Sequence, residues 1–135
     1  MREIPLSFLP VLAAAGAKMA LGALWYSPLL FLDRWHRASG VTEKEMKEGM
    51  ARALAVELAG SLIMAVVLLH AVRYAGAETA LQGMAVGFFN WLGFVAVVTI
   101  GVVTYQRKPF ALFLLQNGYL LLSLLAMGAI LALWG

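Results

Sequence analysis

One apolar stretch near the start of the chain carries a single charge. Residues 13 to 31 read AAAGAKMALGALWYSPLLF, a run of small and apolar residues that carries one cation, Lys18, and stops at Pro28. A bare ammonium in hydrocarbon costs several kcal/mol, so Lys18 needs a partner or water. Glu57 is the only acid inside another apolar segment. The sequence therefore raises the question of whether these two side chains meet.

The composition places the chain among integral membrane proteins. Of its 135 residues, 63% are hydrophobic and 13% are charged, whereas a soluble domain has about 45–50% apolar and about 25% charged residues. The charges cluster between long apolar runs, which is typical of membrane spans and their loops. The length fits one domain over residues 1–135 and leaves no room for a separate soluble enzyme.

The basic balance points to lipid rather than nucleic acid. Ten bases face seven acids, and the bases lie in short loops beside apolar runs. Contact with anionic headgroups of the bilayer explains this placement, so we expect lipid as a partner and no nucleic acid. The chain has no cysteine, which excludes disulfides, thiol nucleophiles and thiolate metal sites.

Four apolar runs are each long enough to cross a bilayer core of about 30 Å. The predicted spans lie near residues 6–26, 43–73, 79–105 and 110–134. The fold class predicted is all-α, an integral membrane four-helix bundle. We expect the first span to be retained rather than cleaved as a signal peptide, because its apolar character continues past Ala17.

Local signals place the span ends. Pro28 biases the residue before it out of helical geometry and ends the first span. The 29–38 segment then runs among cations and is predicted to lie in the headgroup region as a short interfacial segment. Thr42 to Glu45 is a capping box that starts the second helix, and the sequence predicts no break in that helix until about Tyr74. Thr79 is the predicted N-cap of the third.

The cations predict an orientation. Seven of them follow the first and third spans, namely Arg34, Arg37, Lys44, Lys47, Arg52, Arg107 and Lys108. Arg2 and Arg73 lie on the other side, and Lys18 is within the membrane. The positive-inside rule places the seven in the cytoplasm. We therefore expect a multi-pass protein of the plasma (inner) membrane with both termini outside.

Polar residues at similar depths form a predicted layer in the inner leaflet. At 1.5 Å per residue, Lys18 lies about 10 Å, Glu57 about 7–8 Å, and Gln116 and Asn117 about 10–12 Å from the cytoplasmic boundary. Asn90 lies nearer the middle of the membrane. Three interpretations follow for Lys18 and Glu57: a structural ion pair whose hydrogen bonds the amides complete, a polar cavity on an ion or proton path, or a lysine that snorkels to the surface.

Other residues are expected to serve packing and anchoring. Gly83 and Gly87 form a small-xxx-small pair that lets another helix approach closely. Trp25, Tyr26 and Trp35 are expected to lie at the membrane interface. A single histidine near the outer surface, His70, is a poor metal site without a second ligand, so we predict no metal and no cofactor.

Several motifs together resemble a known family. They are ALGALWYSPL at 20–29 with Trp35, NWLGF at 90–94, NGY at 117–119 and Met127-Gly128. This set is similar to the signature of a prokaryotic family of small four-helix membrane proteins, known as a domain of unknown function (number seventeen sixty-one). The resemblance covers nearly the whole chain. It implies four helices and a membrane location, and it carries over no activity and no catalytic residues.

Two kinds of function remain open. The first is a structural or accessory membrane protein that acts through helix packing, as a homo-oligomer or as a subunit of a larger membrane complex. The alternative is a small ion, proton or solute transporter or channel that uses the polar layer. An enzyme is not expected, because the layer lacks a nucleophile–base pair and a metal-ligand cluster. A cavity touching Lys18 and Glu57 favours transport, whereas a dry, paired site favours structure.

Overall fold

The computed structural model describes residues 8–134, and every regular element in that range is helical. The elements are α1 (Phe8–Trp25), α2 (Leu32–Ser39), α3 (Glu43–Glu48), α4 (Met50–Ala75), α5 (Ala80–Trp91), the π-helical turn η1 (Leu92–Ala96), α6 (Val97–Tyr105) and α7 (Phe110–Trp134). Four helical runs are long and apolar enough to cross a membrane: α1, α4, α5 through α6, and α7. The all-α membrane fold predicted from the sequence is confirmed. Residues 6 and 7 of the predicted first span, and Arg2 of the cation count, lie outside the described residues.

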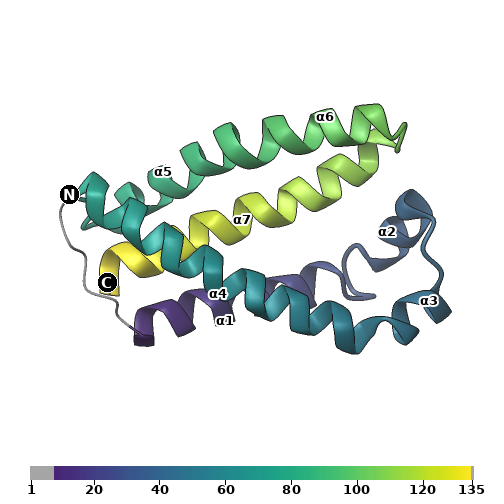
Figure 1. Ribbon diagram of the computed structural model, residues 1–135, viewed down its shortest axis with the longest axis horizontal. Helices are drawn as coiled ribbons and strands as arrows, with labels where there is room; N and C mark the ends of the chain where they lie inside the picture. The colour runs from purple at the N-terminus through teal and green to yellow at the C-terminus, as the bar shows by residue number, and fades with distance from the viewer. Residues whose placement is uncertain (1–7, 135) are drawn as a thin grey trace.

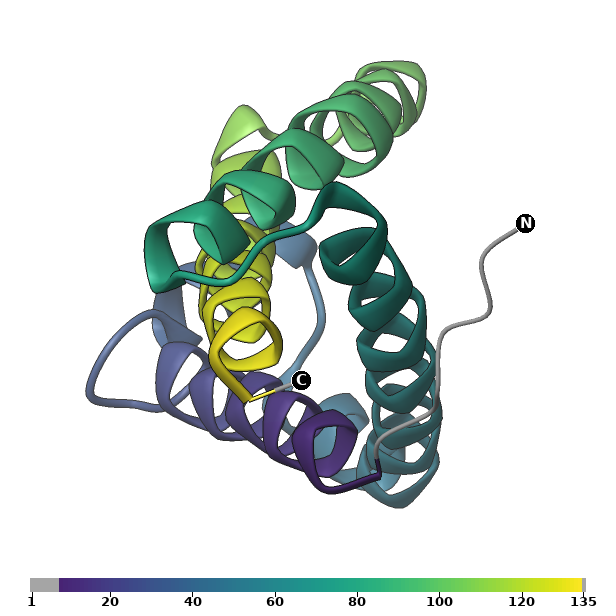
Figure 2. The same cartoon turned by 90° about the vertical axis from the view of Figure 1, so that its left-hand side faces the viewer.

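Helix α7 is the element against which the others pack. It contacts α5 most extensively and also packs against α1 and α4, so it runs between them (Figures 1 and 2). The apolar core lies where α1, the second half of α4 and the second half of α7 meet. Its fully buried members include Ala14, Ala65, Leu69, Val72, Met127 and Leu131.

The connecting segments gather at two ends of the molecule. Figure 1 shows α2, α3 and the turn between α6 and α7 at one end, and the beginning of α1, the α4–α5 turn and the end of α7 at the other. The segments that carry the seven cations therefore share one end. This is the arrangement that four consecutive antiparallel spans require.

The predicted caps are present. The side chain of Thr42 accepts a hydrogen bond from the Glu45 amide, and the Glu45 carboxylate accepts one from the Thr42 amide. Thr79 and Gln82 form the equivalent box at the start of α5. Gly40 and Gly76 close α2 and α4 with φ of 76° and 71°, a left-handed conformation in which glycine has no steric penalty.

The prediction of one unbroken helix over 43–73 is wrong at Gly49. Helix α3 ends at Glu48 and α4 begins at Met50, with Gly49 at φ −94° and ψ 3° between them. The Ala53 amide still donates to the Gly49 carbonyl at 2.9 Å, so the chain bends rather than unwinds. Glycine in a helix is about 1 kcal/mol less favourable than alanine. Because every residue from 47 to 59 is exposed, little packing resists the bend.

The third span also departs from the uniform helix predicted for 79–105. A π-helical turn, η1, separates α5 from α6 without ending the span. The Thr99 hydroxyl, just beyond that turn, donates to the Val95 carbonyl at 2.7 Å and lies 3.2 Å from the Asn117 Oδ1. An extra residue in one turn rotates the following helix face by about 100°, which changes the side chains that α6 turns toward α7.

Candidate intramembrane polar site

Lys18 ties α1 to α4. Its ammonium donates to the Glu57 carboxylate at 2.9 Å and to the Ser61 hydroxyl at 3.1 Å. Glu57 and Ser61 are four residues apart on α4 and therefore lie on one face of that helix. Lys18 is only 3% exposed. Its charge is thus held by two acceptors from one neighbouring helix.

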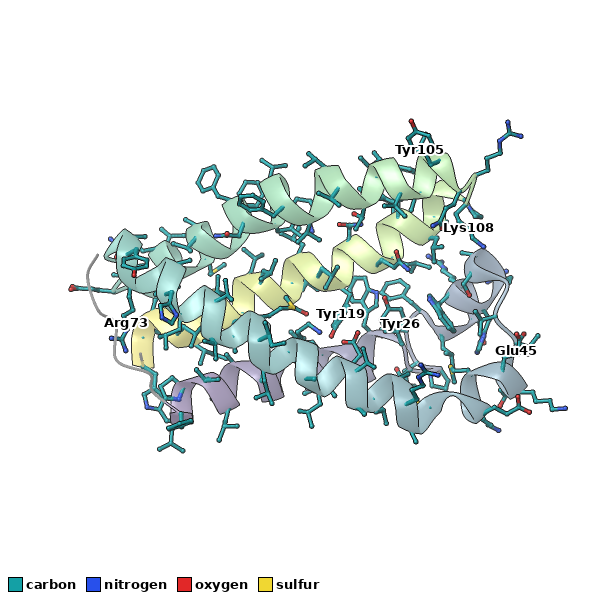
Figure 3. All side chains as sticks on the ribbon, in the orientation of Figure 1. Tyr26, Glu45, Arg73, Tyr105, Lys108 and Tyr119 are labelled. Carbon is teal, nitrogen blue, oxygen red and sulfur yellow. The ribbon has the colours of Figure 1, made fainter. Side chains whose placement is uncertain are left out.

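Tyr119 brings α7 into the same site. The Lys18 ammonium lies 5.3 Å from the centre of the Tyr119 ring, a geometry worth about 0.5–2 kcal/mol as a cation–π contact. The Tyr119 hydroxyl donates to the Lys18 carbonyl at 3.1 Å. Figure 3 shows Tyr119 and Tyr26 side by side between α7 and the neighbouring helices. Three helices therefore meet at one ammonium.

The two charges of the pair differ sharply in exposure. The Lys18 side chain is 4% exposed, whereas the Glu57 side chain is 55% exposed. One carboxylate oxygen of Glu57 holds the ammonium, and within residues 8–134 no donor reaches the other. Every position from 50 to 59 on this half of α4 is exposed. The site is therefore closed on the lysine side and open on the carboxylate side.

Helices α1 and α7 interlock through two glycines and two aromatic rings. A β-carbon on Gly22 of α1 would lie 2.9 Å from the Tyr119 hydroxyl, and one on Gly118 of α7 would lie 2.9 Å from the Trp25 ring. Each glycine thus makes room for the ring that the other helix contributes. The Trp25 indole also donates to the Leu115 carbonyl at 2.9 Å. This geometry brings the WYSP and NGY motifs into contact.

Further ring contacts join this interlock to the interfacial segment. Tyr26 packs edge-on against Tyr119 at 5.6 Å and against Trp35 at 6.1 Å, between ring centres. The Trp25 ring lies 4.5 Å from that of Phe31. Trp25, Tyr26 and Trp35 are all half-buried. Trp25 ends α1, Tyr26 follows it, and Trp35 lies on α2, so these ring contacts hold α2 to the spans.

The predicted polar layer is divided between two places. Asn117 lies away from the ion pair: its side-chain amide donates to the Thr99 hydroxyl at 2.9 Å, and its backbone carbonyl accepts from the Trp91 indole at 3.2 Å. Asn90 donates to the Val86 carbonyl of its own helix at 2.8 Å. Gln116 is half-buried, and in the described part of the chain no hydrogen bond joins it to Lys18 or Glu57.

The amides therefore do not complete the hydrogen bonds of the ion pair; the Ser61 hydroxyl accepts from the ammonium, and the Tyr119 ring faces it as a cation–π contact. Counting along the sequence places Asn117 and Lys18 at similar depths, but it does not give the direction of the side chain. A step of two residues along a helix rotates the side-chain direction by about 200°. Asn117 consequently faces α6 while Tyr119 faces α1. Ser61 had a detectable signal, since it lies one turn after Glu57 on the same helix face. Tyr119 had none beyond its place in the NGY motif.

Gly83 and Gly87 lie at a close helix contact within the chain. A β-carbon on Gly83 would overlap the Gly128 carbonyl of α7, and one on Gly87 would overlap the Leu124 carbonyl. The two helix backbones therefore touch directly. This surface of α5 is covered by α7 and is not free to receive another subunit.

His70 lies away from the ion pair, near the other end of α4. Its Nδ1 is 2.8 Å from the Val66 carbonyl of the same helix. Across residues 8–134, no three histidine, aspartate or glutamate side chains lie close enough to hold a metal ion. That no metal or cofactor is used stays a prediction.

Comparison with known proteins identifies the family of the chain. No curated protein and no solved structure matches the chain. A family model described as a protein of unknown function (DUF1761) matches residues 9–132, which takes in the α1–α7 interlock, the ion pair and the glycine contact. The chain therefore belongs to the DUF1761 family, a family of unknown function.

Proposed function

We propose that this protein is a non-enzymatic membrane protein that acts through helix association, and that it assembles with further copies of itself. The support is the chemistry of its intramembrane polar groups, which tie one helix to another: Lys18 to Glu57, and Asn117 to Thr99. The observation that carries the proposal is the half-exposed carboxylate of Glu57 on the exposed half of α4.

An exposed carboxylate at this depth needs a donor that lipid chains do not supply. An unsatisfied charge in the hydrocarbon region is costly. Large apolar side chains surround Glu57 on the same half of α4, where Leu54, Val56 and Leu58 are 50%, 64% and 49% exposed. A second copy packed here covers the apolar side chains and provides polar groups for the free oxygen. The glycine face of α5 is already occupied by α7, so the 50–60 half of α4 is the proposed contact.

The location and orientation belong to the same proposal. We place the protein in the plasma membrane, with the α2–α3 and α6–α7 connections in the cytoplasm and both termini outside. Its support is that the seven loop cations gather at one end of the molecule (Figure 1), which the positive-inside rule assigns to the cytoplasm.

Cross-linking in native membranes tests the proposed contact. The chain has no cysteine, so Leu54→Cys, Val56→Cys and Leu58→Cys each introduce a single thiol on α4. A short bismaleimide should link at least one of these variants into a dimer. The matched control is Val97→Cys on the outer face of α6, which is 57% exposed and should stay monomeric. A product with a different protein would indicate a subunit of a larger complex, and no product at all three α4 positions would rule out this face.

The open side of the ion pair also supports the alternative, a proton or ion path. A carboxylate that is exposed on one side and bound to an ammonium on the other can exchange protons with a path that runs along the exposed side. The discriminating measurement is proton flux into liposomes that contain the purified protein and a pH-sensitive dye. The association proposal predicts the same flux as in protein-free liposomes. Flux that Glu57→Gln abolishes would favour transport.

A further inference from the structure

A groove opens where the interfacial segment meets α7. It has a volume of about 530 Å³ and lies at the end of the molecule that holds α2 and the α6–α7 turn. Its lining comes from the end of α1, from α2 and from the first turns of α7. The residues that the argument uses are Trp25, Phe31, Arg34, Arg37, Ala111 and Leu114.

Two arginines on α2 provide the polar end of this groove. The guanidinium carbon of Arg34 lies 5.9 Å from the centre of the Phe31 ring, which holds that side chain against the groove wall. The Arg37 Nε donates to the Asp33 carbonyl at 3.5 Å. Both arginines are exposed, and the ion pairs among residues 8–134 involve neither of them. Their remaining N–H groups are free to bind an anion.

The other end of the groove is apolar and runs into the membrane span. Along α7 the lining extends from Pro109 through Ala111 and Leu114 to Leu115, a rise of about 9 Å along the helix axis. The Trp25 and Phe31 rings form the facing wall. The groove thus joins two cations at the headgroup level to an apolar surface that leads toward the bilayer centre.

We propose that this groove binds one anionic phospholipid. The phosphate and headgroup lie against Arg34 and Arg37, because a guanidinium presents a planar set of donors that matches phosphate oxygens. The first part of an acyl chain lies along Ala111 and Leu114. A free phosphate leaves the apolar wall uncovered, and a zwitterionic lipid brings a choline or amine close to the two cations. The proposal does not depend on association between copies.

Native mass spectrometry of the full chain in detergent tests this site. The probes are phosphatidylglycerol and phosphatidylcholine with the same acyl chains. We expect the dissociation constant of the first phosphatidylglycerol to be lower than that of the first phosphatidylcholine by about tenfold or more, because two arginines attract an anionic headgroup. Arg34→Gln/Arg37→Gln should remove that preference. The control Lys44→Gln/Lys47→Gln, which removes the same charge from exposed positions on α3, should retain it.

Two further measurements distinguish lipid binding in the groove from attraction to surface charge in general. Ala111→Trp fills the apolar end while keeping both arginines, and it should also lower the affinity for phosphatidylglycerol about tenfold. Glycerol phosphate, which lacks acyl chains, should not compete with the lipid at equal concentration. Equal affinity for the two lipids, equal loss in the Lys44/Lys47 control, or full competition by glycerol phosphate would overturn the proposal.

Discussion

At the scale of single residues, the Lys18 ammonium joins α1 to α4 and α7. Lys18 has acceptors on α4 and an aromatic face on α7. Glu57 has the ammonium on one side and an open surface on the other. Removing a partner from a buried charge is costly, because the remaining charge is left uncompensated. In detergent, which replaces the bilayer around α4, an exposed charge can find water or detergent headgroups instead.

This asymmetry predicts unequal effects for the two single substitutions. Glu57→Gln leaves the buried Lys18 ammonium without its counter-charge and should lower the free energy of unfolding by about 3 kcal/mol. Lys18→Met leaves the half-exposed carboxylate and should cost only about 1 kcal/mol. The double variant should recover part of the loss, because no unpaired charge remains. Thermal unfolding in detergent measures all three.

The double-mutant cycle isolates the pairwise interaction. A coupling free energy clearly above zero supports the ion pair as the link between α1 and α4. Strictly additive losses would show that the two side chains do not interact in the folded protein.

Outside the membrane, the capping box at Thr42 makes a prediction about pH. Hydrogen bonds from the Thr42 amide and hydroxyl lower the pKa of the Glu45 carboxylate below its ordinary value of 4.5. A folded-state pKa below the unfolded one contributes stability that is present above pH 4.5 and is lost as pH falls through the folded pKa. The start of α3 should therefore fray in acid.

A titration of Glu45 by NMR checks this directly. Thr42→Ala removes the hydroxyl and keeps the amide, so the Glu45 pKa should rise part of the way toward 4.5. Thr79→Ala, which alters the other capping box, is the matched control and should leave the pKa of Glu45 where it was. A Glu45 pKa that Thr42→Ala does not change would show that the hydroxyl has no part in the shift.

At the scale of helices, glycine decides which surfaces touch. Gly83 and Gly87 let α5 contact the backbone of α7. Gly22 of α1 makes room for the Tyr119 ring of α7, and Gly118 of α7 makes room for the Trp25 ring of α1. In lipid, helices associate through close packing and polar contacts rather than through exclusion of water. Small residues at these crossings therefore set the architecture.

Substitution of Gly83 tests the α5–α7 contact. Gly83→Leu places a side chain where the Gly128 carbonyl lies, so the helices must separate, and overpacking of this kind costs about 1–3 kcal/mol. Gly101→Leu is the control on the same span, because a β-carbon there meets nothing within 4 Å. The midpoint of thermal unfolding should fall for Gly83→Leu and stay close to wild type for Gly101→Leu. Equal midpoints for both would contradict the close crossing.

Some features of the fold and of the polar site could be predicted from the sequence, and others could not. The number of spans, the capping box at Thr42, the N-cap at Thr79 and the Pro28 boundary follow from local signals, namely apolar run length, cap residues and proline, and they are found. The depth of Lys18 and Glu57 follows from counting residues. The direction that Asn117 faces does not, because it depends on how α7 is rotated against its neighbours. The η1 turn is equally hidden, since LGFVA is as apolar as the rest of its span.

At the scale of the whole molecule, the arrangement of connections predicts the topology. Single cysteines at Ser39 and Glu78 lie in the α2 and α4–α5 regions, at opposite ends of the molecule. In intact cells, a membrane-impermeant maleimide should label position 78 and should reach position 39 only after the membrane is opened. Labelling of position 39 alone in intact cells would reverse the orientation.

We propose that the exposed half of α4 and its Glu57 carboxylate bring copies of the chain together. Counting subunits in polymer nanodiscs, which are excised from membranes without detergent, tests this most directly. A fluorescent label on each chain allows the copies to be counted by single-molecule photobleaching. If copies associate, most discs should hold two or more of them. Discs that hold one copy at every expression level, with no other protein bound, would contradict it.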